Sequence, residues 1–160
     1  MVKSQGSDWK RGLLLAGAAL LAGAAFMPLF RTEPTQASSS AESSVKIAWS
    51  KDFEAARQAA TKSGKPVLVE FYADWCPPCR LMEEITFQDP KVAELTRKLV
   101  PVHLNVDDNQ ALAERFRVDG IPQSFVLAPD GKILAHTEGY NDPRQFSAFL
   151  QAGLTKGDRP

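Results

Sequence analysis

An almost continuous apolar run, Val67–Tyr72, leads directly into the chain's only two cysteines, Cys76 and Cys79. Such a run is typical of a strand that is covered on both faces, at the centre of an α/β sheet. Pro77 and Pro78 lie between the cysteines and suit the first turn of a helix, where a missing N–H group costs little. The pattern therefore predicts an α/β fold in which the cysteines lie where a central strand ends and a helix begins.

Two thiols at the start of a helix have distinctive chemistry. A thiolate there is stabilised by unpaired backbone N–H groups and by the positive end of the helix dipole. This lowers the thiol pKa, and the thiolate is the reactive form. We predict that Cys76, nearer the helix start, is the more exposed thiol and the attacking nucleophile, and that Cys79 resolves the mixed disulfide. A static disulfide, or a metal site with ligands beyond these two, stays open as an alternative.

The remaining pattern predicts further helices and strands in the same domain. Ser50 is expected to cap the first helix, and the helix that carries the cysteines is expected to break near Gln88. A later helix is expected to be capped by Asp107 or Asp108. Further strands are expected at residues 100–106, 124–128 and 133–136, a short opening strand at 45–49, and a last helix from Asp142. This order predicts a mixed sheet with helices on both faces.

The N-terminal region differs in composition from the rest of the chain. Lys3, Lys10 and Arg11 precede an uncharged run at residues 12–30 that is rich in Leu, Ala and Gly. Both a cleaved signal peptide and an uncleaved membrane anchor fit the length of this run. The preceding positive charge predicts that the remainder is exported. The expected parts are a signal peptide or anchor (1–31), a flexible tether (32–44), a folded domain (45–154) and a tail (155–160).

Two motifs resemble the thioredoxin superfamily. They are Trp75-Cys76-Pro77-Pro78-Cys79 after a hydrophobic strand and Gly120-Ile121-Pro122 before a later one. Within that superfamily, Ala73-Asp74-Trp75-Cys76 and Thr86-Phe87-Gln88-Asp89-Pro90 are most similar to an exported group that includes the C-terminal domain of DsbD-type reductases. The resemblance implies a thioredoxin fold in which Pro122 is a cis-proline that faces the disulfide. It also implies that Trp75, Ile121 and Pro122 bind the substrate.

Glu70 is a carboxylate within the apolar run. Burying it costs roughly several kcal/mol unless it is neutral or paired. The resemblance places it where the family has a buried acid that exchanges protons with the resolving cysteine. We therefore expect Glu70 to have a raised pKa and to deprotonate Cys79 through a water. The alternative is a strand-end carboxylate that points to solvent.

The chain departs from the thioredoxin pattern at two positions. Pro77 replaces the usual Gly after the first cysteine and has no N–H to contact the sulfur, so the family's redox potential is not carried over. His103 stands where thioredoxins often have a Lys that pairs with the buried acid. A His there is expected to titrate near neutral pH, unless it is simply a residue of the surface or the sheet edge.

The resemblance implies a thiol-disulfide oxidoreductase, and the N-terminal region predicts a location outside the cytoplasm, in the periplasm or another extracytoplasmic compartment. We expect it to reduce disulfide-containing proteins with electrons from a membrane or soluble thiol donor, and to need no cofactor or metal. A disulfide oxidase or isomerase, or a metal-delivery protein that uses Cys76 and Cys79, is the alternative. Single-pass anchorage by residues 12–30 in the inner membrane stays open. The 19 basic and 19 acidic residues suggest no nucleic-acid partner.

Overall fold

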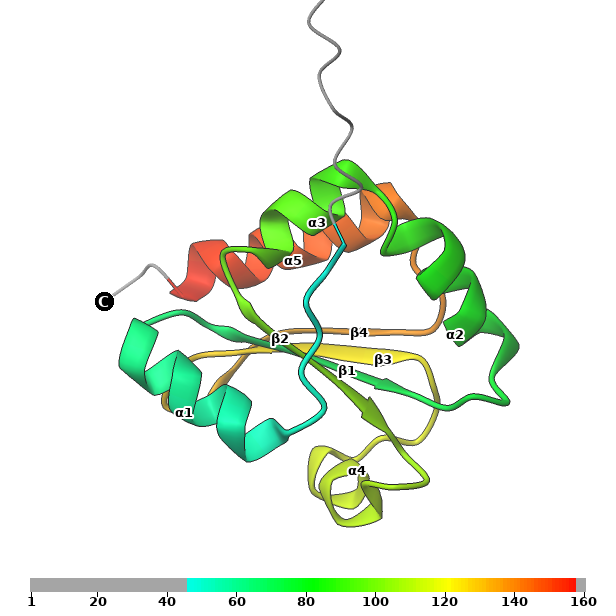
Figure 1. Cartoon of the computed structure of the whole chain (residues 1–160), viewed down its shortest axis with the longest axis horizontal. Coiled ribbons are helices and arrows are strands. Elements are labelled where there is room, and N and C mark those ends of the chain that lie inside the picture. The colour runs from blue at the N-terminus through cyan, green and yellow to red at the C-terminus, as the bar shows by residue number, and fades with distance from the viewer. Residues whose placement is uncertain (1–45, 158–160) are drawn as a thin grey trace, which may run out of the picture. The chain divides into compact units, whose positions relative to one another are not determined.

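The central strand predicted from the apolar run is β1, Val67–Tyr72, in the interior of a four-stranded sheet (Figure 1). In this computed structural model, which describes residues 46–157, the strand order is β2-β1-β3-β4. β1 is parallel to β2 and antiparallel to β3, and β3 is antiparallel to β4. The predicted mixed sheet is therefore confirmed. The other strands are β2 (Val100–Asn105), β3 (Gln123–Leu127) and β4 (Ile133–Glu138).

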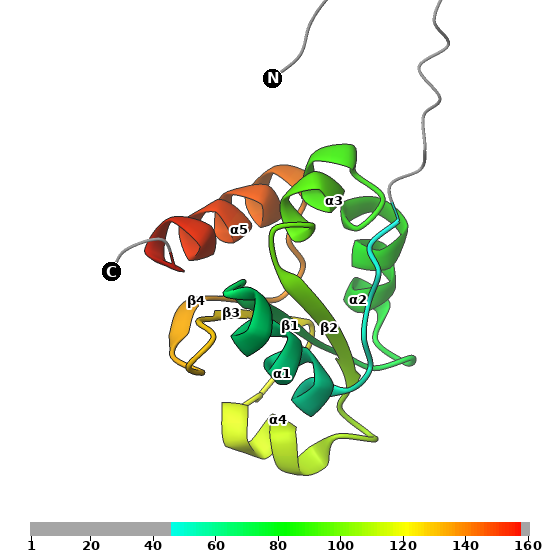
Figure 2. The same ribbon diagram turned by 60° about the vertical axis from the view of Figure 1, so that its left-hand side comes forward.

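Helices cover both faces of the sheet, as predicted (Figure 2). α1 and α4 lie against one face, and α2, α3 and α5 lie against the other. α2 continues directly into a π-helix, a form that occurs often at functional sites. The bounds are α1 (Phe53–Ser63), α2 (Pro77–Leu81), the π-helix (Met82–Thr86), α3 (Pro90–Thr96), α4 (Gln110–Phe116) and α5 (Pro143–Gly157).

The two faces of β1 contribute to two separate hydrophobic cores. Val67, Val69 and Phe71 pack with residues of α1 and α4, whereas Leu68 packs with residues of α3 and α5. Because side chains alternate along a strand, Glu70 points to the same face as Leu68, toward α2, α3 and α5. The first five residues of β1 are buried, which confirms the prediction of a strand covered on both sides.

Two predicted helix caps are wrong. Asp52, not Ser50, caps α1, and its Oδ1 accepts a hydrogen bond of 3.0 Å from the N–H of Ala55. Ser50 instead forms an isolated bridge to Val102 of β2, which is all that the described residues show of the expected opening strand. Asn109, and neither Asp107 nor Asp108, stands at the N-cap of α4. Both aspartates lie in the turn that follows β2, where the N–H of Asp107 donates a hydrogen bond to Oδ1 of Asn105.

The predicted break near Gln88 is confirmed, and its cause is local. The π-helix ends at Thr86, and Asp89 then caps α3, accepting hydrogen bonds from the N–H groups of Lys91 and Val92. Pro90 follows at the first helical position, where its missing N–H costs nothing. α5 continues to Gly157, so the tail expected from residue 155 is helical up to that point.

The signal peptide or anchor expected at residues 1–31 and the tether expected at 32–44 lie outside the described residues. Within residues 46–157, we find no helix whose length and apolar content suffice to cross a bilayer.

Gly153 of α5 is a close-packing position, and it yields a stability prediction. A Cβ on Gly153 would lie 2.7 Å from Cβ of Val126 on β3 and 2.8 Å from both of its methyl groups. Because Val126 is fully buried in an inner strand, it cannot move aside. We expect Gly153→Ala to lower the free energy of unfolding by about 1–3 kcal/mol, in spite of the better helix propensity of Ala.

Chemical denaturation of the purified chain measures this effect. Gln151→Ala is the matched control, since Gln151 is exposed on the same helix, and its effect is expected to stay within about 0.5 kcal/mol. Unchanged or increased stability of Gly153→Ala would show that the contact between α5 and β3 has room for a methyl group.

Candidate functional site

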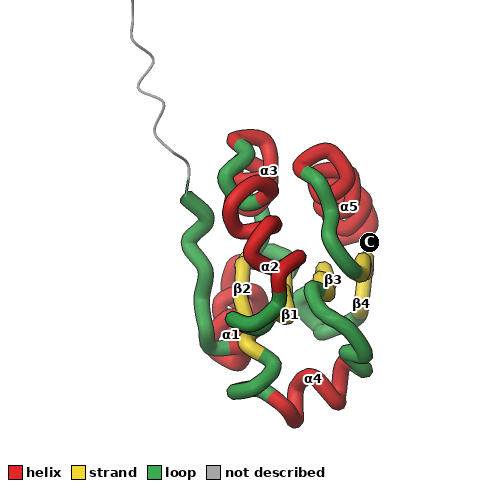
Figure 3. Tube along the Cα trace, turned by 90° about the vertical axis from the view of Figure 1, so that its right-hand side faces the viewer, coloured by secondary structure: helices red, strands yellow, loops and turns green. Residues whose placement is uncertain are grey.

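Cys76 and Cys79 are joined by a disulfide where β1 leads into α2, at the end of the sheet that faces the viewer in Figure 3. Their Cα atoms are 5.4 Å apart. Cys76 is the N-cap of α2, and Pro77 and Pro78 occupy the first helical positions. The backbone N–H of Cys79 donates a hydrogen bond of 3.3 Å to Sγ of Cys76. The predicted placement of the pair at a helix start is therefore correct, and one helix N–H group acts on Cys76.

The prediction that Cys76 is the more exposed thiol is wrong. Cys76 is 2% exposed and Cys79 is 3% exposed, so burial does not distinguish them. Tyr72, Val106 and Ile121 pack around the pair. Tyr72 stands just before the cysteines in the chain, whereas Val106 and Ile121 come from distant segments, and Val106 was missed from the sequence. What distinguishes Cys76 is its N-cap position.

The segment Ile121–Pro122 lies against the disulfide. The Ile121–Pro122 peptide bond is cis, as the resemblance implied. The carbonyl oxygen of Ile121 is 3.7 Å from Sγ of Cys76. A backbone carbonyl of this segment therefore lies next to Cys76.

Trp75 extends the surface beside the disulfide. Its side chain is 64% exposed, and its indole Nε1–H donates a hydrogen bond of 2.9 Å to Oδ2 of Asp107. Asp107 follows β2 and lies far from Trp75 in the sequence. It was interpreted as a helix cap, and no local pattern indicates its contact with Trp75.

Glu70 is buried, so the alternative of a solvent-facing carboxylate is wrong. It is 1% exposed, and burial raises its pKa from 4.5 to about 8. Ser124 of β3 donates a hydrogen bond to Oε2 of Glu70, which partly offsets this rise, and the negative charge of Glu83 adds to it. Glu70 is therefore mostly protonated at neutral pH. Ser124 and Glu83 were missed from the sequence, since neither stands near Glu70 in the chain.

His103 of β2 is the register partner of Glu70, and its expected titration near neutral pH is wrong. Burial, with a smaller contribution from the charge of Lys51, lowers the pKa of His103 from 6.5 to about 4. Its ring stacks on Tyr72 at 3.7 Å between centroids. Since a neutral imidazole carries no charge, it does not stabilise ionised Glu70 as a Lys would. His103 does lie on an edge strand, but its side chain is mostly covered.

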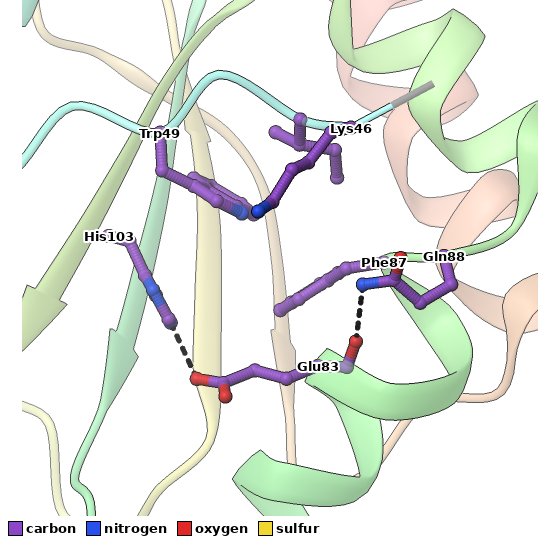
Figure 4. Close-up of a pocket in the computed structure, with 7 residues that line it drawn as sticks. Lys46, Trp49, Glu83, Phe87, Gln88 and His103 are labelled. Atoms are coloured by element: carbon purple, nitrogen blue, oxygen red, sulfur yellow. Dashed lines mark hydrogen bonds and ion pairs between the residues drawn. The ribbon is translucent and has the colours of Figure 1, made fainter. Parts of the chain in front are cut away.

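A pocket of about 190 Å³ opens beside His103 (Figure 4). Figure 4 shows His103 and Glu83 pointing toward one another across it, with 4.0 Å between Nε2 and Oε1. Trp49 and Phe87 form its aromatic walls. Burial, followed by the charges of Asp74 and Glu84, raises the pKa of Glu83. This pocket places polar side chains next to the buried acid but does not include the cysteines.

Among residues 46–157, no group of three or more His, Cys, Asp or Glu side chains is placed to hold a metal ion. The geometry brings together the two cysteines, Ile121 and Pro122. The disulfide, the cis-proline segment and Trp75 adjoin one another, and Glu70 lies on the sheet face that α2 covers.

Comparison with known proteins is consistent with this geometry. The family model described as Thioredoxin-like domain matches residues 53–154. The thiol:disulfide interchange protein DsbD of Pectobacterium atrosepticum is 31% identical over 157 residues, covering 92% of this chain and 27% of that protein. Across two such DsbD relatives, the chain spans only 17% and 27% of their length.

Two solved structures resemble this fold. A thioredoxin from Thermus thermophilus superposes with a TM-score of 0.64 at 28% identity, covering 71% of this chain and 91% of that one. The reduced C-terminal domain of DsbD from Neisseria meningitidis gives a TM-score of 0.56 at 28% identity, with 62% and 92% covered.

Proposed function

The chain belongs to the thioredoxin-like family, its homologues support thiol-disulfide oxidoreductase activity, and we propose that it reduces protein disulfides outside the cytoplasm. One observation carries the proposal. The only two cysteines form a disulfide at the N-terminus of α2, against the Ile121–Pro122 segment.

The reaction follows from the positions of the two sulfurs. In the reduced chain, the Cys76 thiolate attacks one sulfur of a partner's disulfide. A bond forms from Cys76 to that sulfur, and the partner's other sulfur leaves as a thiolate. The carboxylate form of Glu70, which is the minor form at neutral pH, then takes the proton of Cys79 through a water, and the Cys79 thiolate attacks Sγ of Cys76. This forms the Cys76–Cys79 disulfide and releases the partner's second thiolate, so two electrons pass to the partner. A thiol donor then reduces the pair again.

The surface around the disulfide supports docking of a protein. Trp75 offers a large exposed face, and its indole is held by Asp107. Ile121 and Pro122 present backbone groups next to Cys76. We assign these residues to substrate binding.

The first turn of α2 supports the reducing direction. Pro77 and Pro78 have no N–H group, so among the described residues only the Cys79 N–H donates to Sγ of Cys76. A thiolate with few donors is weakly stabilised, and a weakly stabilised reduced form makes the pair a stronger reductant.

The location outside the cytoplasm rests on the sequence of residues 1–31 and on the relationship to DsbD. The charged start and apolar run of that region suit export by a signal peptide or anchor. Disulfide-containing proteins of that compartment are the proposed substrates, and a membrane or soluble thiol is the proposed donor.

Equilibration of the purified chain with glutathione buffers tests the direction. A reduction potential near ~−270 mV or more negative would support the reductase proposal, whereas a value near ~−120 mV would overturn it in favour of an oxidase. Pro77→Ala supplies an N–H at the first helical position and is expected to make the potential less negative. Stoichiometric copper(I) binding without reduction of insulin disulfides would favour metal delivery instead.

A further inference from the structure

A second hollow, which we call the α4 groove, lies between the end of β2, helix α4 and the segment that follows α4. Its volume is about 590 Å³. Val106 and Val118 form its apolar surface, and its charged side chains are Asp107, Glu114, Arg117 and Asp119.

The α4 groove begins next to the disulfide. Val106 lines the groove and also packs with Cys76 and Cys79. Asp107 lines it as well and holds the indole of Trp75. A polypeptide whose cysteine reaches Cys76 therefore has this groove directly beside its flanking residues.

The groove carries an excess of negative charge. Three of its side chains are carboxylates and one is a guanidinium, and all four residues are exposed. Within residues 46–157, the ion pairs involve other residues, so Asp107, Glu114 and Asp119 are not neutralised by a close cation. Exposed charges that are not paired act on an approaching molecule over about a Debye length, ~8 Å at physiological ionic strength.

The helix that forms one wall is anchored to the core on its other side. The ring of Phe116 packs against the rings of Phe53, Phe71 and Phe125, with centroids 5.6, 5.4 and 5.1 Å away. The core therefore holds this wall of the groove in place. Figure 2 shows α4 at the edge of the fold, with the sheet between it and α3 and α5.

We propose that the α4 groove binds the segment next to the reactive cysteine of the partner protein, and that this segment carries Lys or Arg beside an apolar residue. The apolar residue covers Val106 and Val118, and the cations face the carboxylates. The inference rests on the proposed reductase function and adds the chemistry of the preferred substrate. Charge complementarity of this kind raises the association rate and selects partners.

Reduction of two matched peptides by the reduced full-length chain tests the proposal. Both peptides contain the same disulfide and the same apolar neighbour, flanked by Lys in one and by Glu in the other. We expect the Lys peptide to be reduced roughly tenfold faster at low ionic strength, and the ratio to fall as salt screens the charges. The uncharged bis(2-hydroxyethyl) disulfide is the reference substrate, because its reduction rate does not depend on the charge of the groove.

Neutral substitutions identify the groove as the source of the preference. Glu114→Gln with Asp119→Asn is expected to lower the Lys-to-Glu rate ratio by about threefold or more, with the reference reaction unchanged. Glu94→Gln with Asp130→Asn removes the same charge from α3 and the β3–β4 turn and is expected to leave the ratio unchanged.

Each outcome decides one proposal. Equal reduction of both peptides by the wild-type chain, or the same ratio in the groove variant and the wild type, overturns the inference and leaves the reductase function standing. Faster reduction of the Glu peptide overturns it as well, since it would mean that Arg117 attracts acidic segments more strongly than the carboxylates attract basic ones. Failure to reduce either peptide or the reference disulfide overturns the proposed function itself.

Discussion

Cys79→Ala is expected to stop turnover and to leave a chain that captures its substrates as mixed disulfides through Cys76. Without Cys79, the bond between Cys76 and the partner has no neighbouring thiol to open it. Loss of a covalent-catalysis residue costs about a thousandfold or more in turnover. Insulin reduction measures the loss, and mass spectrometry of complexes that dissociate on addition of dithiothreitol identifies both the partner and the cysteine that holds it.

Cys76→Ala is the matched control, and it carries particular weight here because the two cysteines are equally buried. Only the N-cap position and the Cys79 N–H bond distinguish Cys76 as the nucleophile. We expect Cys76→Ala to be inactive and to capture nothing. Capture through Cys79 in that variant would reverse the assigned order of attack.

Glu70→Gln is expected to change how stability depends on pH. Below about pH 4.5 Glu70 is protonated in both the folded and the unfolded chain. Between there and about pH 8 the unfolded carboxyl ionises while the folded one keeps its proton, so the folded state binds more protons and stability falls as pH rises. The slope is at most about 1.4 kcal/mol per pH unit. The Gln variant lacks this loss, so its advantage over wild type grows by a few kcal/mol across the range.

The same substitution is expected to slow the chemistry. If Glu70 accepts the Cys79 proton, its loss reduces turnover by roughly a hundredfold. The rise of the wild-type rate toward pH 8, where Glu70 ionises, is expected to disappear as well. Denaturation and insulin reduction from pH 5 to 9 measure both effects. Glu94→Gln, an exposed carboxyl on α3, is the control. Turnover and a pH profile unchanged in Glu70→Gln would remove Glu70 from the mechanism.

Much of the fold was predictable because its signals are local. The apolar run predicted β1, and Asp89 followed by Pro90 predicted the break before α3. Caps were less predictable, since several residues near α1 and α4 carry suitable side chains. Asp52 caps α1 because Ser50 is held by a bridge to Val102, a contact made with a distant strand.

The candidate site, like the fold, was predictable only in part from the sequence. The thiols and their place at a helix start were evident from residue types and spacing, and the resemblance together with the apolar run implied the buried acid. The burial of Cys76, the low pKa of His103 and the Asp107 bond to Trp75 were not. Each depends on side chains that arrive from other strands and loops, and burial and pKa are properties of those surroundings.

By itself, then, the sequence of this chain determined which atoms we propose to react, because cysteine and glutamate chemistry and helix-start geometry are encoded within a few neighbouring residues. Only the tertiary structure decided how those atoms are presented. It buries both sulfurs equally, keeps Glu70 protonated at neutral pH and His103 neutral, and places an acidic groove beside the disulfide. The physical reason is that desolvation and charge act through space, between segments that the sequence separates.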